Sequence, residues 1–492
     1  MADNHRKPHA IIIPYPLQGH VNPSVHLAIK LASRGFAVTF INTQSVHHHT
    51  LKALEQERGG GGEGETDRSY DIFANVRRSG LDIRYTTVSD GLPVGFDRSL
   101  NHDQFMASLL HVFSAHVEEA LGSIVAEPGG RADCLIADTF FVWPSRVAEK
   151  FGLSYVSFWT EPALVFTLYY HLDLLRINGH FACQDCREDP IDYIPGVKAL
   201  RPNDMTSYLQ ESETSSVCHQ IIFNAFRDVK AADFILCNTI RELETSTVSA
   251  LQDLKPFYSI GPVFPEGFTR SDVATSLWPE SDCTRWLDTK ARDSVLYVSF
   301  GSYAHVSRPD LVEIAHGLSL SKVDFVWVLR ADIVSSNDVD PLPDGFKQQL
   351  GDRAIIIPWC RQNAVLSHPA IGGFLTHCGW NSILESIWSG VPLLCFPLLT
   401  DQFTNRKLVV DDWRIGLNLS DRNKITREEV ADKIARLMSK ESGSEFKGAV
   451  EALKKKLEEA LMPDGSSAKD FDQFLVDMKH RIHQKEHLSS GA

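Results

Sequence analysis

The chain has 492 residues, of which 43% are hydrophobic and 23% charged, a balance typical of soluble globular proteins with room for two domains. Its formal net charge of −14 argues against nucleic acid as a partner, because phosphate backbones attract basic surfaces. No stretch is long and apolar enough for a signal peptide or a membrane span, so we expect a cytoplasmic protein, without membrane insertion, that acts as a monomer.

Cysteine and histidine clusters give only weak signals. Nine cysteines, an odd number, are scattered along the chain, which favours free thiols in a reducing compartment. Cys183 and Cys186 form a CQDC pair that could be a redox or half-zinc motif, but no second pair with zinc spacing follows, so chance is favoured. His47, His48 and His49 could bind a metal weakly, and a loop or helix-start position is the favoured interpretation.

The first half of the chain alternates between strand and helix patterns. Asn22 and Pro23 predict a helix start, as N-cap and first helical residue, and Gly35 predicts its end. A strand on each side of this helix makes a βαβ unit, so we expect a parallel sheet. GGGGEGE, residues 59–65, predicts a flexible surface insertion. Strands are predicted at 9–16, 36–42, 132–141 and 152–159, and a helix at 142–151.

A segment rich in Pro, Gly and aromatic residues then interrupts the pattern, and the alternation restarts after it. We therefore predict two α/β domains in tandem. A final segment, 469–482, carries apolar residues on one helical face, which we expect to pack against the first domain. The predicted boundaries are 1–255 for the first domain, 256–282 for a linker, 283–465 for the second domain and 466–492 for a C-terminal helix and tail.

The turn HCGWNSILES, residues 377–386, lies where a predicted strand passes into a helix. Ligands of open α/β sheets bind beyond the carboxyl ends of the strands, and a helix start favours an anion. His377, Asn381 and Ser382 are placed to donate to a phosphate. Trp380 offers a flat apolar wall, and Glu385 could accept hydrogen bonds from a ribose diol.

A plainer interpretation of the same turn is a capping box made by Ser382 and Glu385, which would leave His377, Gly379 and Trp380 unexplained. Neither a GxGxxG after the first strand nor a GxxxxGK[ST] loop is present. A second glycine turn, SFGS at 299–302, also follows a predicted strand, and its Ser302 could donate to the same diphosphate.

The 44 residues from Trp359 to Gln402 resemble the signature box of plant family-1 UDP-dependent glycosyltransferases. The segments YPLQGHVNP, ADTF, FWT, SFGS and WRIG also resemble that family, so the likeness covers nearly the whole chain. Arg361 stands where the family usually has Pro, which bears on the rigidity of the loop beside the uracil platform.

The resemblance implies the α/β GT-B fold, with two tandem Rossmann-like domains whose parallel sheets face a central cleft. The donor would bind to the second domain and the acceptor to the first. The implied roles are a uracil platform at Trp359, uracil and ribose contacts at Gln362, ribose hydroxyls at Glu385, the diphosphate at Ser302, His377, Asn381 and Ser382, and the sugar at Trp380, Asp401, Gln402 and, from the first domain, Thr160.

Glycosyl transfer to a hydroxyl needs a base. His20 follows the first predicted strand, and its ordinary pKa suits a base at neutral pH. Position alone leaves a loop histidine without a role equally open, and the resemblance implies catalysis. Asp138 ends an apolar strand, and in the family this carboxylate holds the catalytic histidine. The acceptor would then attack the anomeric carbon opposite UDP, and the configuration should invert.

We expect no metal. DVD, residues 338–340, imitates a metal-binding DxD motif but lies in a segment of turn-forming residues typical of a solvated surface. The expected co-substrate is UDP-glucose, and the expected acceptor is a small lipophilic phenol, flavonoid or terpenoid of plant secondary metabolism. An acceptor pocket and ordinary core packing explain four aromatic residues equally well: Phe141, Trp143, Phe158 and Phe166.

Three alternatives remain open at this point. The enzyme could use another UDP-sugar, such as galactose or xylose. The chain could be a catalytically silent module that binds nucleotide sugars, although the presence of both His20 and Asp138 speaks against it. The sheet pattern alone also suggests an NAD-dependent oxidoreductase.

Overall fold

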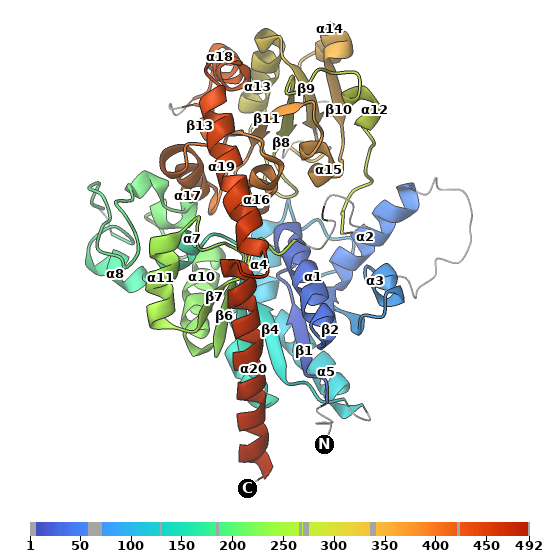
Figure 1. The fold of residues 1–492 in the computed structure, drawn as a ribbon, viewed down its shortest axis with the longest axis vertical. Helices are drawn as coiled ribbons and strands as arrows, with labels where there is room; N and C mark the ends of the chain where they lie inside the picture. The colour runs from blue at the N-terminus through green and yellow to red at the C-terminus, as the bar shows by residue number, and fades with distance from the viewer. Residues whose placement is uncertain are drawn as a thin grey trace.

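The structure is a computed structural model that describes residues 6–57, 71–127, 130–183, 186–264, 268, 275–334, 341–420 and 424–490. Two α/β domains lie one above the other, with the second domain at the top of Figure 1 and both chain ends at the bottom. The predicted α/β class with two parallel sheets is confirmed. The predicted insertion at 59–65 and the DVD motif at 338–340 lie outside the described residues.

The first domain is built on a seven-stranded sheet in the order β3-β2-β1-β4-β5-β6-β7, with every pairing parallel. Its central strands are mostly apolar and are buried throughout, as expected where helices cover both faces of a parallel sheet. The strands are β1 His9–Ile13, β2 Ala37–Thr43, β3 Ile83–Val88, β4 Cys134–Asp138, β5 Ser154–Trp159, β6 Phe234–Cys237 and β7 Phe257–Ser259.

The second domain has a six-stranded parallel sheet in the order β10-β9-β8-β11-β12-β13. In each sheet the strand order reverses beside the first strand, and this is the crevice where open α/β sheets bind ligands. The strands are β8 Val295–Ser299, β9 Asp324–Val328, β10 Ala354–Ile357, β11 Ile371–Thr376, β12 Leu393–Cys395 and β13 Gly416–Asn418.

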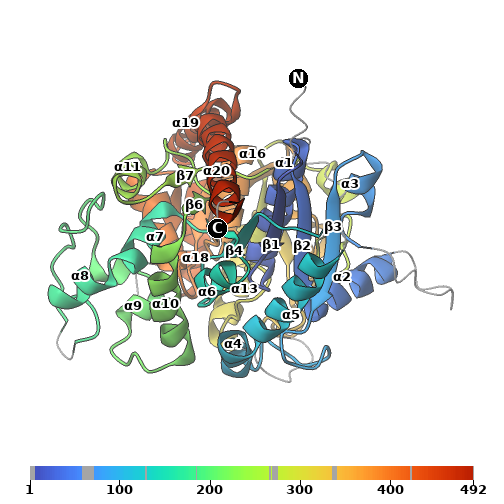
Figure 2. The same ribbon diagram turned by 90° about the horizontal axis from the view of Figure 1, so that it is seen from below.

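Helices cover both sheets (Figures 1 and 2). Those of the first domain are α1 Gln18–Ser33, α2 Gln44–Glu57, α3 Ala74–Arg78, α4 His102–His111, α5 Phe113–Ala126, α6 Pro144–Lys150, α7 Ala163–Tyr170, α8 Leu172–Ile177, α9 Ser207–Gln210, α10 Val217–Asp228 and α11 Thr245–Leu254. Those that follow are α12 Thr284–Leu287, α13 Arg308–Ser321, α14 Phe346–Leu350, α15 Gln362–Leu366, α16 Trp380–Ser389, α17 Gln402–Lys407, α18 Arg427–Met438, α19 Ser444–Leu461 and α20 Ser466–Ser490. Among the described helices, none combines the length and apolar character of a membrane span.

The first helix begins earlier than its sequence predicts. α1 starts at Gln18, so Pro23 lies inside the helix and Asn22 is not its N-cap. A proline lacks the N–H that would bond to the carbonyl four residues before it, so Pro23 leaves the Gly19 carbonyl without a helical partner. β1 ends at Ile13 and α1 begins at Gln18, so only a short turn separates them, and the first turn of the helix carries a backbone acceptor without a helical partner.

The predicted linker boundary is also corrected. β7 pairs in parallel with β6, although its residues fall inside the predicted linker 256–282. The first sheet therefore extends to Ser259. The three residues of β7 are too few to show a pattern that indicates a strand. Pairing with β6 and packing against α20 stabilise this strand instead.

Seven cysteines are buried free thiols, in line with the prediction. Cys183 and Cys186 are instead joined by a disulfide, which corrects the interpretation of their spacing as chance. Their Cα atoms lie 5.3 Å apart, within the range that a disulfide can bridge. The histidine triplet lies near the start of α2, and His47 contacts the Tyr85 hydroxyl with its Nδ1 at 3.2 Å.

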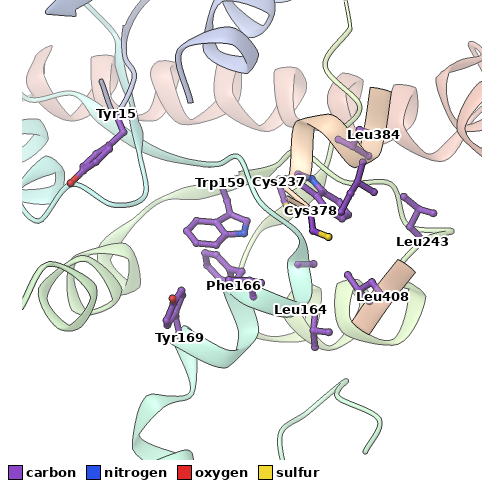
Figure 3. Close-up of a cluster of buried hydrophobic side chains, with 14 of the residues drawn as sticks. Tyr15, Trp159, Leu164, Phe166, Tyr169, Cys237, Leu243, Cys378, Leu384 and Leu408 are labelled. Carbon is purple, nitrogen blue, oxygen red and sulfur yellow. The ribbon is translucent and has the colours of Figure 1, made fainter. Parts of the chain in front are cut away.

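An apolar cluster runs through both domains. Figure 3 shows part of it, with Cys378, Leu384 and Leu408 of the second domain in the same cluster as Trp159 and Phe166 of the first. The four aromatic residues Phe141, Trp143, Phe158 and Phe166 are all buried in the core, at most 3% exposed, so core packing accounts for them.

The C-terminal helix α20 returns to the first domain and lies along it (Figure 1). Its Asp470 carboxylate accepts from the backbone N–H and the hydroxyl of Ser259 at 3.0 and 2.8 Å. Phe474, 1% exposed, packs edge-on against Phe234 and Tyr258. This helix thereby covers one face of the first sheet.

We expect Phe474→Ala to lower the free energy of unfolding of the first domain by about 3–5 kcal/mol, because it removes a buried ring and leaves a cavity. Val476, two residues on, is 60% exposed, so Val476→Ala is a matched control with an effect within about 0.5 kcal/mol. Urea unfolding followed by fluorescence measures both. Equal effects of the two substitutions would mean that α20 does not stabilise the domain.

Candidate active site

A cavity of about 480 Å³ lies between the domains, at the carboxyl ends of both sheets. The cavity is lined by residues from the start of α1, the end of β5, the SFGS turn and the start of α16. Eleven of the thirteen predicted site residues line it: His20, Thr160, Ser302, Trp359, Gln362, His377, Trp380, Asn381, Ser382, Glu385 and Asp401. The other two, Asp138 and Gln402, lie just behind its wall.

His20 and Asp138 form a hydrogen-bonded pair. β1 and β4 are neighbours in the sheet, so the first turn of α1 and the last residue of β4 meet at one edge. His20 Nδ1 lies 2.7 Å from Asp138 Oδ2, and the carboxylate is almost completely buried. A carboxylate accepts, so Nδ1 carries the proton, and Nε2, which makes no hydrogen bond with the described residues, is left as the basic nitrogen.

Thr160 contributes to this pair rather than standing free for the sugar. Its Oγ1 lies 2.9 Å from His20 Nδ1. The hydroxyl and the carboxylate together fix the plane and the tautomer of the ring. The tilted rings of Tyr15 and Phe140, whose centroids are both 5.7 Å from that of His20, limit its movement further.

The turn singled out in the sequence is a helix start, but not a capping box. α16 begins at Trp380 with Gly379 as N-cap, so Ser382 and Glu385 lie inside the helix. No side chain caps the helix, which leaves the N–H groups of its first turn available to an anion. The Ser382 hydroxyl and the Glu385 carboxylate instead accept from Gln362 Nε2 at 3.0 and 2.9 Å.

Asn381 links the two domains. Its Nδ2 donates to the Gly19 carbonyl at 2.6 Å, the acceptor that Pro23 leaves free. Next to it, the Trp380 indole N–H donates to the Asn238 carbonyl at 2.7 Å. The Asn381 side chain therefore has a structural role in addition to its predicted contact with the diphosphate. Its backbone N–H remains at the helix start.

His377 is packed between two glycines. A Cβ added at Gly301 or at Gly379 would lie 2.5 Å from its Nε2, so only glycine fits at either position. Its Nδ1 is buried and has no hydrogen-bond partner among the described residues. Burial, followed by the charge of Arg330, lowers the pKa of His377 to about 4. The ring is therefore neutral at physiological pH.

Trp359 has a second indole beside it. The ring of Trp278, from the predicted linker, lies 4.7 Å from that of Trp359 at 34°. Arg361, where the family usually has Pro, precedes α15 and pairs with Glu280 of the same linker at 3.3 Å. Arg361 thus connects this loop to the linker through a partly exposed ion pair. No sequence pattern pointed to Trp278.

Glu385 is half-buried inside this wall. Burial raises its pKa to about 7, and the hydrogen bond from Gln362 offsets part of that rise. The Tyr297 hydroxyl donates to Gln362 Oε1 at 3.3 Å, which fixes the amide so that its nitrogen faces Glu385. A carboxyl with this pKa can accept or donate a hydrogen bond near neutral pH.

Three carboxyl groups surround the part of the cavity next to His20. Asp401 accepts from Thr400 Oγ1 and Asn405 Nδ2, and burial raises its pKa. Glu161, which sequence reasoning missed, lines the cavity, and its Oε2 is buried without a hydrogen-bond partner in the part of the chain that the structure describes. Burial, and then the charges of Asp401 and Asp138, raise the pKa of Glu161 well above its usual range.

Gln402 is placed differently from its predicted role. Its Oε1 accepts from the backbone N–H groups of Leu398 and Leu399 at 2.9 and 3.1 Å, and the residue is 5% exposed. It therefore shapes the loop that carries Asp401. Within the described residues, no group of three or more His, Cys, Asp or Glu side chains could hold a metal ion.

The chain is similar to known proteins over nearly its whole length. The family described as "UDP-glucoronosyl and UDP-glucosyl transferase" matches residues 272–453. UDP-glycosyltransferases 86A2 and 86A1 of Arabidopsis thaliana are 62% and 57% identical, covering 94% and 98% of this chain and 93% and 96% of their own. The structure of Phytolacca americana UGT2 with UDP-2fluoro-glucose and pterostilbene matches with a TM-score of 0.75 at 26% identity, covering 96% of this chain and 100% of its own.

We expect Glu385→Gln to be more stable than the natural protein at pH 8, by about 1–2 kcal/mol after allowance for partial exposure. The raised pKa means that the folded state holds this proton more tightly than the unfolded chain. The resulting stabilisation is complete below about pH 4.5 and is lost as the pH rises through about 7. Urea unfolding of both proteins at pH 5 and pH 8 measures the difference, and a difference that is the same at both would contradict this origin.

Proposed function

Since this chain belongs to the plant family-1 UDP-dependent glycosyltransferases, we propose that it transfers glucose from UDP-glucose to a hydroxyl of a small lipophilic plant metabolite. His20 would be the base, and the configuration at the sugar would invert. The observation that supports this most directly is the His20–Asp138 pair, whose free nitrogen faces the same cavity as the start of α16.

In this proposal the donor lies along the second domain. Trp359 stacks on uracil, Gln362 lies near uracil and ribose, and Glu385 binds the ribose hydroxyls. The diphosphate lies against the α16 start, with Ser302 and His377 as further donors. A neutral His377 retains a ring N–H to donate.

The transfer is a single displacement. His20 Nε2 takes the proton of the acceptor hydroxyl while the oxygen bonds to the anomeric carbon. The bond from that carbon to the diphosphate breaks, and its electron pair leaves with UDP. Asp138 stabilises the imidazolium that forms, and the N–H groups at the α16 start stabilise the charge on the leaving group. Attack opposite the leaving group inverts the configuration.

Glucose is the proposed sugar. Trp380 lines the sugar end of the cavity, next to Asp401 and Glu161, and the Phytolacca americana structure holds a fluoro-glucose donor. Its pterostilbene partner, an aromatic molecule, supports a lipophilic acceptor. Competition among UDP-glucose, UDP-galactose and UDP-xylose, with transfer followed by mass spectrometry, separates glucose from the other sugars.

We expect His20→Ala to lower transfer from UDP-glucose to a panel of plant phenols and terpenoids by a factor on the order of 10²–10⁴, because the base is lost. UDP affinity, measured by calorimetry, should stay within about twofold. Asp138→Asn should lower kcat with little change in the donor KM, since an amide no longer favours the required tautomer.

His111, exposed on α4, supplies the matched control, and His111→Ala should transfer at the natural rate. Full activity of His20→Ala would overturn the mechanism. UDP binding without any transfer by the natural protein would instead indicate a silent binding module.

We propose that the reaction needs no metal, since the helix start and neutral donors face the diphosphate site. Transfer measured with excess EDTA, after removal of divalent cations, should proceed at the same rate within about 20%. Loss of turnover that Mg²⁺ or Mn²⁺ restores would contradict the proposal.

A further inference from the structure

Arg330 is a fully buried cation behind the SFGS turn. It lies two residues past the end of β9, and only 1% of its surface is exposed. A charge removed from water is costly unless hydrogen bonds and opposite charge compensate for it. The function described above assigns this arginine no role.

The groups that compensate Arg330 are mostly backbone carbonyls. The guanidinium donates to the carbonyl of Gly301 and, at 2.9 Å, to the carbonyl of Ala304. Its Nε donates to Asp332 Oδ1 at 2.8 Å, and Asp332 is one-third exposed. The ring of Trp278 lies 5.8 Å from the guanidinium carbon. Only one of these partners carries a negative charge, and water screens it.

These contacts set the direction of the turn. Two of its carbonyls point to Arg330, away from the cavity, and Gly301 reaches the required conformation at φ +74°. Ser302, between them, lines the cavity, and no described residue accepts from its backbone N–H. A turn held in this way presents N–H groups to a bound anion on the opposite side.

The same cation acts on His377. This ring rests against Gly301, the residue whose carbonyl Arg330 holds. The positive charge behind the turn disfavours a second positive charge on the ring, which adds to the effect of burial. His377 is thereby kept as a neutral donor, and the fixed charge stays behind the loop instead of in the cavity.

We infer that Arg330 is a positioning residue for the donor diphosphate, holding the Gly301–Ala304 turn so that its donors face the phosphates and adding positive potential behind them. The inference rests on the proposed function, because it requires the diphosphate to bind beside Ser302. It distinguishes UDP, which carries the phosphates, from uridine, which makes only the nucleoside contacts.

Calorimetry with UDP and with uridine tests this inference on three variants. Arg330→Met should weaken UDP binding at least about tenfold while uridine affinity stays within about twofold. Arg330→Lys keeps the charge but loses part of the fork of donors, so its UDP affinity should be intermediate. Donor KM should follow UDP affinity, with kcat changing less.

Asp332→Asn gives a change of opposite sign. An Asn side chain still accepts from Arg330 Nε but removes the neighbouring negative charge, so UDP should bind about two- to fivefold tighter and uridine equally well. Asp253, exposed on α11 of the other domain, is the matched control, and Asp253→Asn makes the same charge change without the effect.

The possible results distinguish a failure of this inference from a failure of the proposed function. Equal loss of UDP and uridine affinity in Arg330→Met, or weaker UDP binding in Asp332→Asn, would make Arg330 a purely structural residue and overturn the inference. Arg330→Lys and Asp332→Asn keep the test decisive should Arg330→Met not fold, as thermal unfolding would show. A natural protein that binds no UDP would refute the proposed function itself.

Discussion

A hydrogen bond between the domains joins the two helix starts on which the site depends. Pro23 deprives Gly19 of its helical donor, and the Asn381 amide supplies a replacement at 2.6 Å from the second domain. Gly19 precedes His20, the proposed base, and Asn381 is the second residue of α16. The contact therefore brings the start of the helix that carries His20 against the start of α16, where the diphosphate is proposed to bind.

The two histidines of the cavity show how environment divides similar side chains between roles. His20 has a buried carboxylate on one nitrogen, which stabilises the charge that a base acquires. His377 has a buried cation and two glycines around it, and its lowered pKa keeps it neutral. One ring can accept a proton, whereas the other stays neutral and keeps a ring N–H to donate, and the difference is set by the neighbours of each ring.

The alternation of apolar segments predicted both parallel sheets and the strands β1, β2, β4 and β5 at the centre of the first, because strands buried in a parallel sheet are mostly apolar. It did not predict β3, β6 or β7. Polar residues that interrupt an apolar segment predicted much of the site. Asp138, at the end of β4, is one of them. Arg330 gives the same signal at the end of β9, and it was overlooked. The start of α1 was misplaced because Pro23 normally begins a helix, and only the second domain supplies the amide that makes its interior position useful.

The predicted linker illustrates what local patterns cannot convey. Its residues looked like a spacer, yet Trp278 lies against Trp359 and Glu280 pairs with Arg361. Both partners are on the loop before α15, so the connection between the domains also forms a wall of the cavity. Arg361, which stands where the family usually has Pro, is thereby connected to the linker through an ion pair. The linker and the loop before α15 are in contact at the end of the cavity where the nucleoside is proposed to bind, so the position of the connecting segment bears on that end of the proposed site.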